Sequence, residues 1–104
     1  SPVENTITPH QISSQSPQLT LISPVDFSIM TINKTRVTGK TNQGAILVAE
    51  SPQETLVQEA SRSGDFSFDF ELSEGANNLY LTSYHDSGES KSQTLTVFYT
   101  TEKL

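Results

Sequence analysis

Apolar and polar side chains alternate along most of this chain, and the clearest run covers residues 65–72. Its apolar residues occupy every second position and mostly acidic residues the positions between: Phe66, Phe68, Phe70 and Leu72 against Asp65, Ser67, Asp69 and Glu71. A helix would scatter the phenylalanines around its circumference, whereas a strand places them on one face. This run therefore predicts a strand with one face in a core and the other in water.

Similar but weaker alternation recurs between turn signals along the rest of the chain. The predicted strands cover residues 19–22, 35–39, 45–49, 55–60, 65–72, 78–85 and 91–100, and residues 29–32 form either a further short strand or an edge crossover. The last two strands flank Asp86-Ser87-Gly88-Glu89 and are expected to form a hairpin. About seven short strands without a helical stripe predict an all-β, two-sheet sandwich. Its predicted core is Leu21, Val37, Leu47, Phe66, Phe68, Phe70, Leu79, Leu81, Leu95 and Val97.

The first 17 residues differ in composition from the rest. They hold four serines and three prolines among few apolar side chains. Such a segment cannot bury a core. We therefore expect a flexible, disordered linker at residues 1–17, rich in Ser, Pro and Gln, and a single sandwich domain at residues 18–104.

Charge and composition narrow the functional classes. Twelve acidic and six basic residues give a net charge of −6, which argues against nucleic-acid binding, since that needs a basic face. No apolar run approaches the roughly 20 residues of a membrane helix, so we expect no membrane insertion in this segment. The absence of cysteine excludes disulfides, thiolate metal sites and a cysteine nucleophile.

The order of several short motifs resembles bacterial immunoglobulin-like domains. These motifs are Leu21-Ile22-Ser23-Pro24, Val37-Thr38-Gly39-Lys40-Thr41, Gly64-Asp65-Phe66, Glu74-Gly75-Ala76-Asn77 and Leu95-Thr96-Val97. Fibronectin type III domains share much of this pattern. The resemblance implies an extracellular or cell-surface location and a non-enzymatic spacer or interaction module of a larger bacterial protein. Its expected partners are neighbouring domains of the same chain.

Candidate catalytic groups are sparse. His85 is followed by Asp86, and serines are abundant, but there is no nucleophile-elbow motif. The carboxylates of Asp65, Asp69 and Glu71 share a strand face, which supplies neither the cleft nor the apolar environment that glycosidase chemistry requires. We therefore expect no enzymatic activity and no cofactor.

Calcium is the one metal for which the sequence offers ligands. Asp86 and Glu89 lie in one loop with Ser87, and Asp26 or Asp65 would supply a further oxygen from a neighbouring end. Calcium takes six to eight oxygen ligands, and this chain has no EF-hand spacing. Asp86 and Glu89 are the candidate metal ligands.

The last hairpin presents the candidate binding face. If its leucines and Val97 point inward, Tyr80, Tyr84 and Phe98 point outward among threonines. The hairpin would bring Phe98 within reach of one of the two tyrosines. Such a face suits stacking against a sugar ring or packing against a protein, as in an accessory module beside a glycoside hydrolase or peptidase. The alternative interpretation is that these side chains only stabilise the sheet by packing against residues of neighbouring strands.

Overall fold

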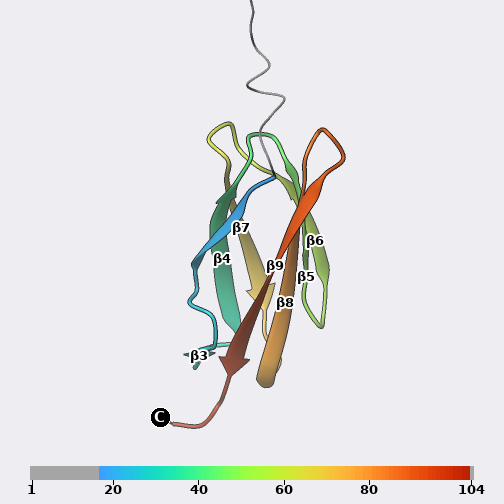
Figure 1. Ribbon diagram of the computed structural model, residues 1–104. Coiled ribbons are helices and arrows are strands. Elements are labelled where there is room, and N and C mark those ends of the chain that lie inside the picture. The colour runs from blue at the N-terminus through green and yellow to red at the C-terminus, as the bar shows by residue number, and fades with distance from the viewer. Residues whose placement is uncertain (1–16, 104) are drawn as a thin grey trace, which may run out of the picture.

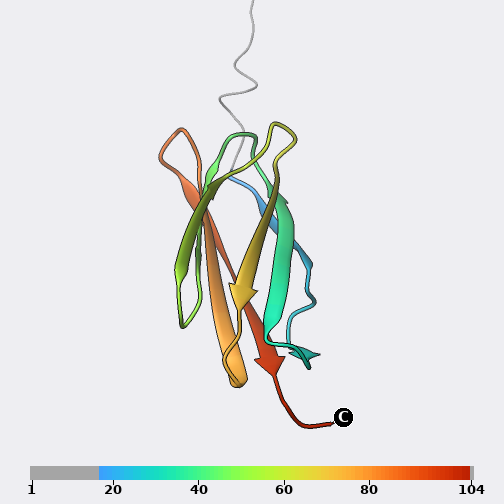
Figure 2. The ribbon, with the colours of Figure 1, turned by 180° about the vertical axis from the view of Figure 1, so that it is seen from behind.

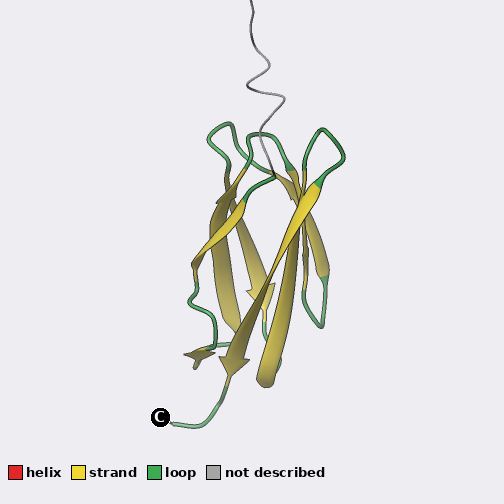
Figure 3. Cartoon of the chain, in the orientation of Figure 1, coloured by secondary structure: helices red, strands yellow, loops and turns green. Residues whose placement is uncertain are grey.

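The computed structural model describes residues 17–103, and every regular element in that part of the chain is a strand (Figures 1 and 3). A three-stranded sheet has the order β2-β4-β7, and a five-stranded sheet has the order β3-β9-β8-β5-β6. The strands are β2 (Leu19–Ser23), β3 (Ser28–Met30), β4 (Lys34–Thr41), β5 (Ile46–Glu50), β6 (Thr55–Glu59), β7 (Asp65–Glu71), β8 (Gly75–Tyr84) and β9 (Ser90–Tyr99). The predicted all-β sandwich is confirmed, with eight strands in place of about seven.

Alternate residues of both sheets form one interior. Phe66, Phe68 and Phe70 all point into it from β7, and successive ring centroids lie 5.9 and 6.1 Å apart. From the facing sheet, β8 and β9 contribute pairs of apolar residues at every second position. The buried apolar residues are Leu19, Val37, Ala45, Leu47, Ala49, Ala60, Phe66, Phe68, Phe70, Leu72, Leu79, Leu81, Leu95 and Val97.

One predicted core residue is misplaced. Leu21 is only partly buried and packs against the margin of the core, while Leu19 is 3% exposed. The reason is that β2 is an edge strand whose pairing with β4 becomes irregular between Leu21 and Ser23. The chain is already leaving the sheet at that point, so Leu19 takes the deeper position.

The chain then changes sheets between β2 and β3. After Pro24 it crosses to the five-stranded sheet, where β3 pairs in parallel with the end of β9 (Figures 1 and 2). Residues 29–32, left open between a strand and a crossover, are thus resolved into a strand that begins at Ser28 and ends at Met30. Ile32 lies beyond it and is exposed.

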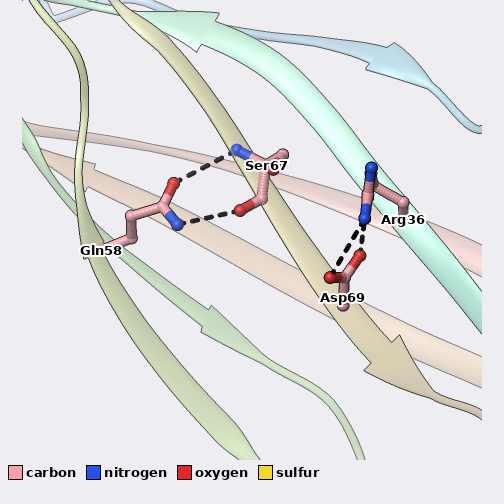
Figure 4. Close-up of polar contacts among 4 residues, drawn as sticks. All are labelled: Arg36, Gln58, Ser67 and Asp69. Carbon is pink, nitrogen blue, oxygen red and sulfur yellow. Dashed lines mark hydrogen bonds and ion pairs between the residues drawn. The ribbon is translucent and has the colours of Figure 1, made fainter.

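Glutamine side chains connect the two sheets along both open sides. Gln58 of β6 donates from Nε2 to the carbonyl of Ser67 on β7 (3.0 Å) and accepts from the Ser67 N–H (3.2 Å; Figure 4). On the other side, Gln93 of β9 donates to the carbonyl of Leu19 on β2 (3.1 Å). These side-chain amides form hydrogen bonds with peptide groups that have no partner strand at the edge of a sheet.

A buried asparagine fixes the turn before β8. Asn77 is fully buried; its Oδ1 accepts from the N–H of Ser73 (2.9 Å), and its Nδ2 donates to the Ser73 carbonyl (2.8 Å). Nδ2 also lies within hydrogen-bond distance of the carbonyls of Gly75 and Val97. A buried amide needs such partners, so the turn and the strand start are specified together.

The predicted linker, residues 1–17, lies outside the described residues except for Pro17. The two sheets use residues 19–99. The division into a linker and a sandwich that begins at residue 18 stays a prediction.

Gly39→Ala should strongly destabilise the domain. A Cβ at Gly39 would contact the carbonyl oxygen of Thr20 and lie 2.6 Å from Cζ of Phe66. Overpacking of this kind costs about 3 kcal/mol in free energy of unfolding. The control is Gly88→Ala, where a Cβ would meet open space and only the positive φ of 90° opposes it, at about 1–2 kcal/mol. Urea denaturation measures both; equal losses would contradict the close approach at Gly39.

Asn77→Ala should lower the free energy of unfolding by about 2 kcal/mol, because it leaves peptide groups around Ser73 without their partner. The matched control is the neighbouring Asn78→Ala. Asn78 is exposed and accepts one hydrogen bond, from the Thr96 hydroxyl. This exposed substitution should cost about 0.5 kcal/mol or less. A thermal or urea unfolding series in which the two variants lose equal stability would refute the role given to Asn77.

Candidate functional site

The outer face of the five-stranded sheet carries the predicted aromatic residues. Tyr80 and Tyr84 project outward from β8 and are 49% and 47% exposed. They lie four residues apart on one strand, or about 13 Å along its axis. A single sugar ring cannot stack on both.

Phe98 does not join the two tyrosines. The β8–β9 register places Phe98 opposite Ala76, whereas Tyr80 lies opposite Thr94 and Tyr84 opposite Ser90. The expectation that Phe98 would lie within reach of a tyrosine is therefore wrong in detail. The length of the loop between β8 and β9 sets this register, and it moves Phe98 towards the far end of the sheet.

The aromatic partner of Phe98 is Phe27, which the alternation pattern did not single out. Their ring centroids lie 6.4 Å apart with an interplanar angle of 27°, and Phe27 is 65% exposed. Phe27 also has a positive φ of 65°, an uncommon conformation for a bulky side chain. Local sequence carries little signal for it, because it lies in the crossover between sheets.

Hydrogen bonds to one β9 residue hold the Phe27 turn in place. The N–H of Phe27 donates to the carbonyl of Thr96 (2.7 Å), and the N–H of Thr96 donates to Oδ1 of Asp26 (2.8 Å). The N–H of Ser28 donates to the carbonyl of Val25 (3.1 Å), which closes the turn. These contacts compensate the backbone strain and fix the ring of Phe27 over Phe98.

Apolar side chains surround the tyrosines on neighbouring strands. Ile46 on β5 lies beside Tyr84, and Val48 lies between Thr82 on β8 and Val57 on β6. Val57 is 66% exposed. The outer face thus has two separate apolar groups: one of Tyr80, Tyr84, Ile46, Val48 and Val57, and one of Phe27, Ile29 and Phe98.

The carboxylates on β7 are paired across the three-stranded sheet. Asp69 Oδ1 lies 2.8 Å from Nε of Arg36, and Asp65 Oδ1 lies 2.8 Å from Nζ of Lys40, each opposite its partner in the β4–β7 register (Figure 4 shows the first pair). The hydrogen bond from Arg36 lowers the pKa of Asp69, and that from Lys40, with help from Ser63, lowers the pKa of Asp65. A general acid needs the opposite shift, so neither carboxyl suits that role.

The candidate calcium ligands lie in the loop between β8 and β9. Glu89 accepts a hydrogen bond from the Ser87 hydroxyl (3.1 Å), and the N–H of His85 donates to the carbonyl of Glu89 (2.8 Å). Across residues 17–103, no three His, Cys, Asp or Glu side chains gather closely enough to hold a metal ion. Calcium binding at Asp86 and Glu89 stays a prediction.

With respect to membranes, residues 17–103 include no helix long and apolar enough to cross a bilayer.

Comparison with solved structures assigns the fold. The fibronectin(III)-like modules of CbhA from Clostridium thermocellum match with a TM-score of 0.60 over 79% of this chain and 95% of that chain, at 13% sequence identity. The fold is a fibronectin type III-like sandwich. No protein-family model matches the sequence, and no curated protein does. The likeness rests on the fold, and it agrees with the family resemblance of the sequence motifs.

Asp69→Asn should destabilise the domain at neutral pH but not in acid. The folded state lowers the pKa of Asp69. The ionised carboxylate therefore contributes fully to the free energy of unfolding above its unfolded-state pKa of about 3.9. This contribution is lost as the pH falls through the lower pKa of the folded state. The difference in unfolding free energy between wild type and variant should be small, as for exposed pairs generally, and should shrink below pH about 4. Urea denaturation across pH measures it. In an Arg36→Gln background the substitution should have no such effect; an unchanged effect there would contradict the pairing.

Proposed function

We propose that this domain is a non-enzymatic spacer or interaction module of a larger extracellular or surface-anchored bacterial protein. The observation that carries the proposal is the path of the chain. The described residues enter the sandwich at one end, just before β2, and leave it at the opposite end, after β9 (Figures 1 and 2). Domains connected through opposite ends extend a chain, so copies or neighbours in series would form a stalk.

The packing supports a passive mechanical role. Interior side chains fill the space between the sheets from both sides, and the buried amide of Asn77 is hydrogen-bonded to Ser73 within the fold. The likeness to modules of CbhA further supports a place within a longer protein. Neighbouring domains of the same chain are the proposed partners.

The second candidate function is glycan or protein binding by the outer face of the five-stranded sheet, as in an accessory module beside a glycoside hydrolase or peptidase. The exposure of Tyr80 and Tyr84, next to Ile46, favours it. Phe98 contributes less than predicted, because it is partly buried and covered on one side by Phe27. The spacing of the tyrosines would suit an extended chain contacted at two points, not one ring.

A direct test of the spacer uses tandem copies joined through the native residues 1–17. Small-angle X-ray scattering of one, two and three copies should give a maximum dimension that grows with each copy, because the connections lie at opposite ends of the sandwich. Copies that fold back into a compact bundle would contradict the proposal.

A titration separates the two candidates. We expect the amide NMR spectrum of the domain to remain unchanged on addition of soluble glycans and cell-wall fragments. Tyr80→Ala and Tyr84→Ala should then change only stability. Localised shifts around these residues, lost in both variants at unchanged melting temperature, would establish the binding function instead. Thr82→Ala, on the same face between the two tyrosines, is the matched control.

A further inference from the structure

The sheets have four edges, and most of them are blocked. On β7, the N–H of Asp65 donates to the Ser61 hydroxyl (3.0 Å), Gln58 occupies both peptide groups of Ser67, and the N–H of Glu71 points to Oε2 of Glu54 (3.4 Å). The edge of β2 faces β9 across a groove of about 630 Å³ that Gln93 bridges. β3 is only three residues long. Short, covered edges resist pairing with other chains.

β6 is the exception. The N–H of Ala60 donates to the carbonyl of Ala45, and the N–H of Ser51 donates to the carbonyl of Glu54. Because paired and unpaired positions alternate in an antiparallel ladder, the peptide groups of Thr55, Val57 and Glu59 point away from β5. Among residues 17–103, nothing bonds to the N–H or carbonyl of these three residues. The strand also contains neither proline nor lysine, the residues that commonly protect an edge.

The side chains of β6 fit a second copy of the same strand. In an antiparallel pairing centred on Val57, all three outward-facing residues find partners: Val57 meets Val57, and Thr55 meets Glu59 in both directions. Each pair exchanges two main-chain hydrogen bonds. On the outer face, Val48 lies beside Val57 within each copy, so a continuous row of four valines would cross the junction.

We propose that β6 is a strand-addition site at which two copies of this chain join their five-stranded sheets antiparallel, with Val57 on the two-fold axis. The partner is a second copy because the strand is self-complementary in hydrogen bonding and side chains, and because this register places no like charges opposite each other. This association goes beyond the proposed spacer function. Connection of domains in series lengthens one stalk, whereas pairing through β6 would join two stalks side by side.

Charge makes the association depend on salt. Each copy carries a net charge of −6, so two copies repel at low ionic strength. Screening shortens the range of this repulsion to about 3 Å at 1 M salt. Association through β6 should therefore strengthen as salt is added, the opposite of an interface built on ion pairs.

The test is sedimentation velocity of the full chain from ~10 µM to ~1 mM, a range that detects weak dimers. The wild type should shift from monomer towards dimer with concentration, and further in ~1 M NaCl. Val57→Lys places like charges on the axis, and Val57→Pro removes the N–H donors there while remaining tolerable on an edge strand. Both should weaken association at least about tenfold. Ile29→Lys, an exposed aliphatic position on the opposite edge of the sheet, should associate like the wild type.

A cross-linking readout keeps the test independent of folding defects. The sequence has no cysteine, so Val57→Cys introduces a single thiol. Hydrogen-bonded antiparallel pairs place their Cα atoms about 5.5 Å apart, within disulfide range. Mild oxidation should give covalent dimer from Val57→Cys and little from Ile29→Cys.

Three results would overturn the proposal. The first is a wild type that stays monomeric at every concentration and salt. The others are dimers that persist unchanged in the folded Val57 variants, or equal cross-linking of both cysteine variants. The scattering test of the spacer is kept independent of these results by placing Val57→Lys in every tandem copy, which removes β6 pairing between copies.

Discussion

A sandwich of two sheets leaves a gap between the sheet edges on each of its two sides. In this domain one glutamine side chain bridges each gap by hydrogen bonds to the opposite sheet. Gln58 satisfies both peptide groups of Ser67, and Gln93 satisfies the carbonyl of Leu19. Both glutamines belong to the five-stranded sheet and reach across to the smaller one. The margins of the apolar interior are thereby bridged, and the peptide groups of Ser67 and the carbonyl of Leu19 are no longer open to other chains.

The surface that remains follows from this closure. The smaller sheet presents ion pairs on its outer face, with Arg36 and Lys40 neutralising the aspartates of β7. The larger sheet presents Tyr80 and Tyr84 together with Val57, next to the β6 edge, whose outward peptide groups bond to nothing within residues 17–103. One molecule thus combines a closed, polar sheet with an open, more apolar one. A module connected through its ends would expose both sheets, and the contacts proposed here with other molecules lie on the larger one.

The sequence predicts what depends on alternation and turns. The β7 run of phenylalanines and the β8–β9 hairpin both follow from local residue patterns. What it does not predict depends on register and on the change of sheet. The shallower position of Leu21 relative to Leu19 goes with the irregular pairing of β2 with β4 after Leu21, and Phe98 meets Phe27 because β3 pairs in parallel with β9. The contact of Phe27 with Phe98 joins residues about 70 positions apart, which periodicity cannot locate.

Residue-resolved hydrogen exchange of the dilute, monomeric protein measures this closure of the sheet edges. If side chains close one edge while β6 stays open, the Ser67 amide exchanges slowly and the Val57 amide exchanges near the rate of an unprotected chain. Gln58→Leu should then speed exchange at Ser67 while leaving the buried amides of β8 unchanged. Fast exchange at Ser67 in the wild type, or no change in the Gln58 variant, would contradict it.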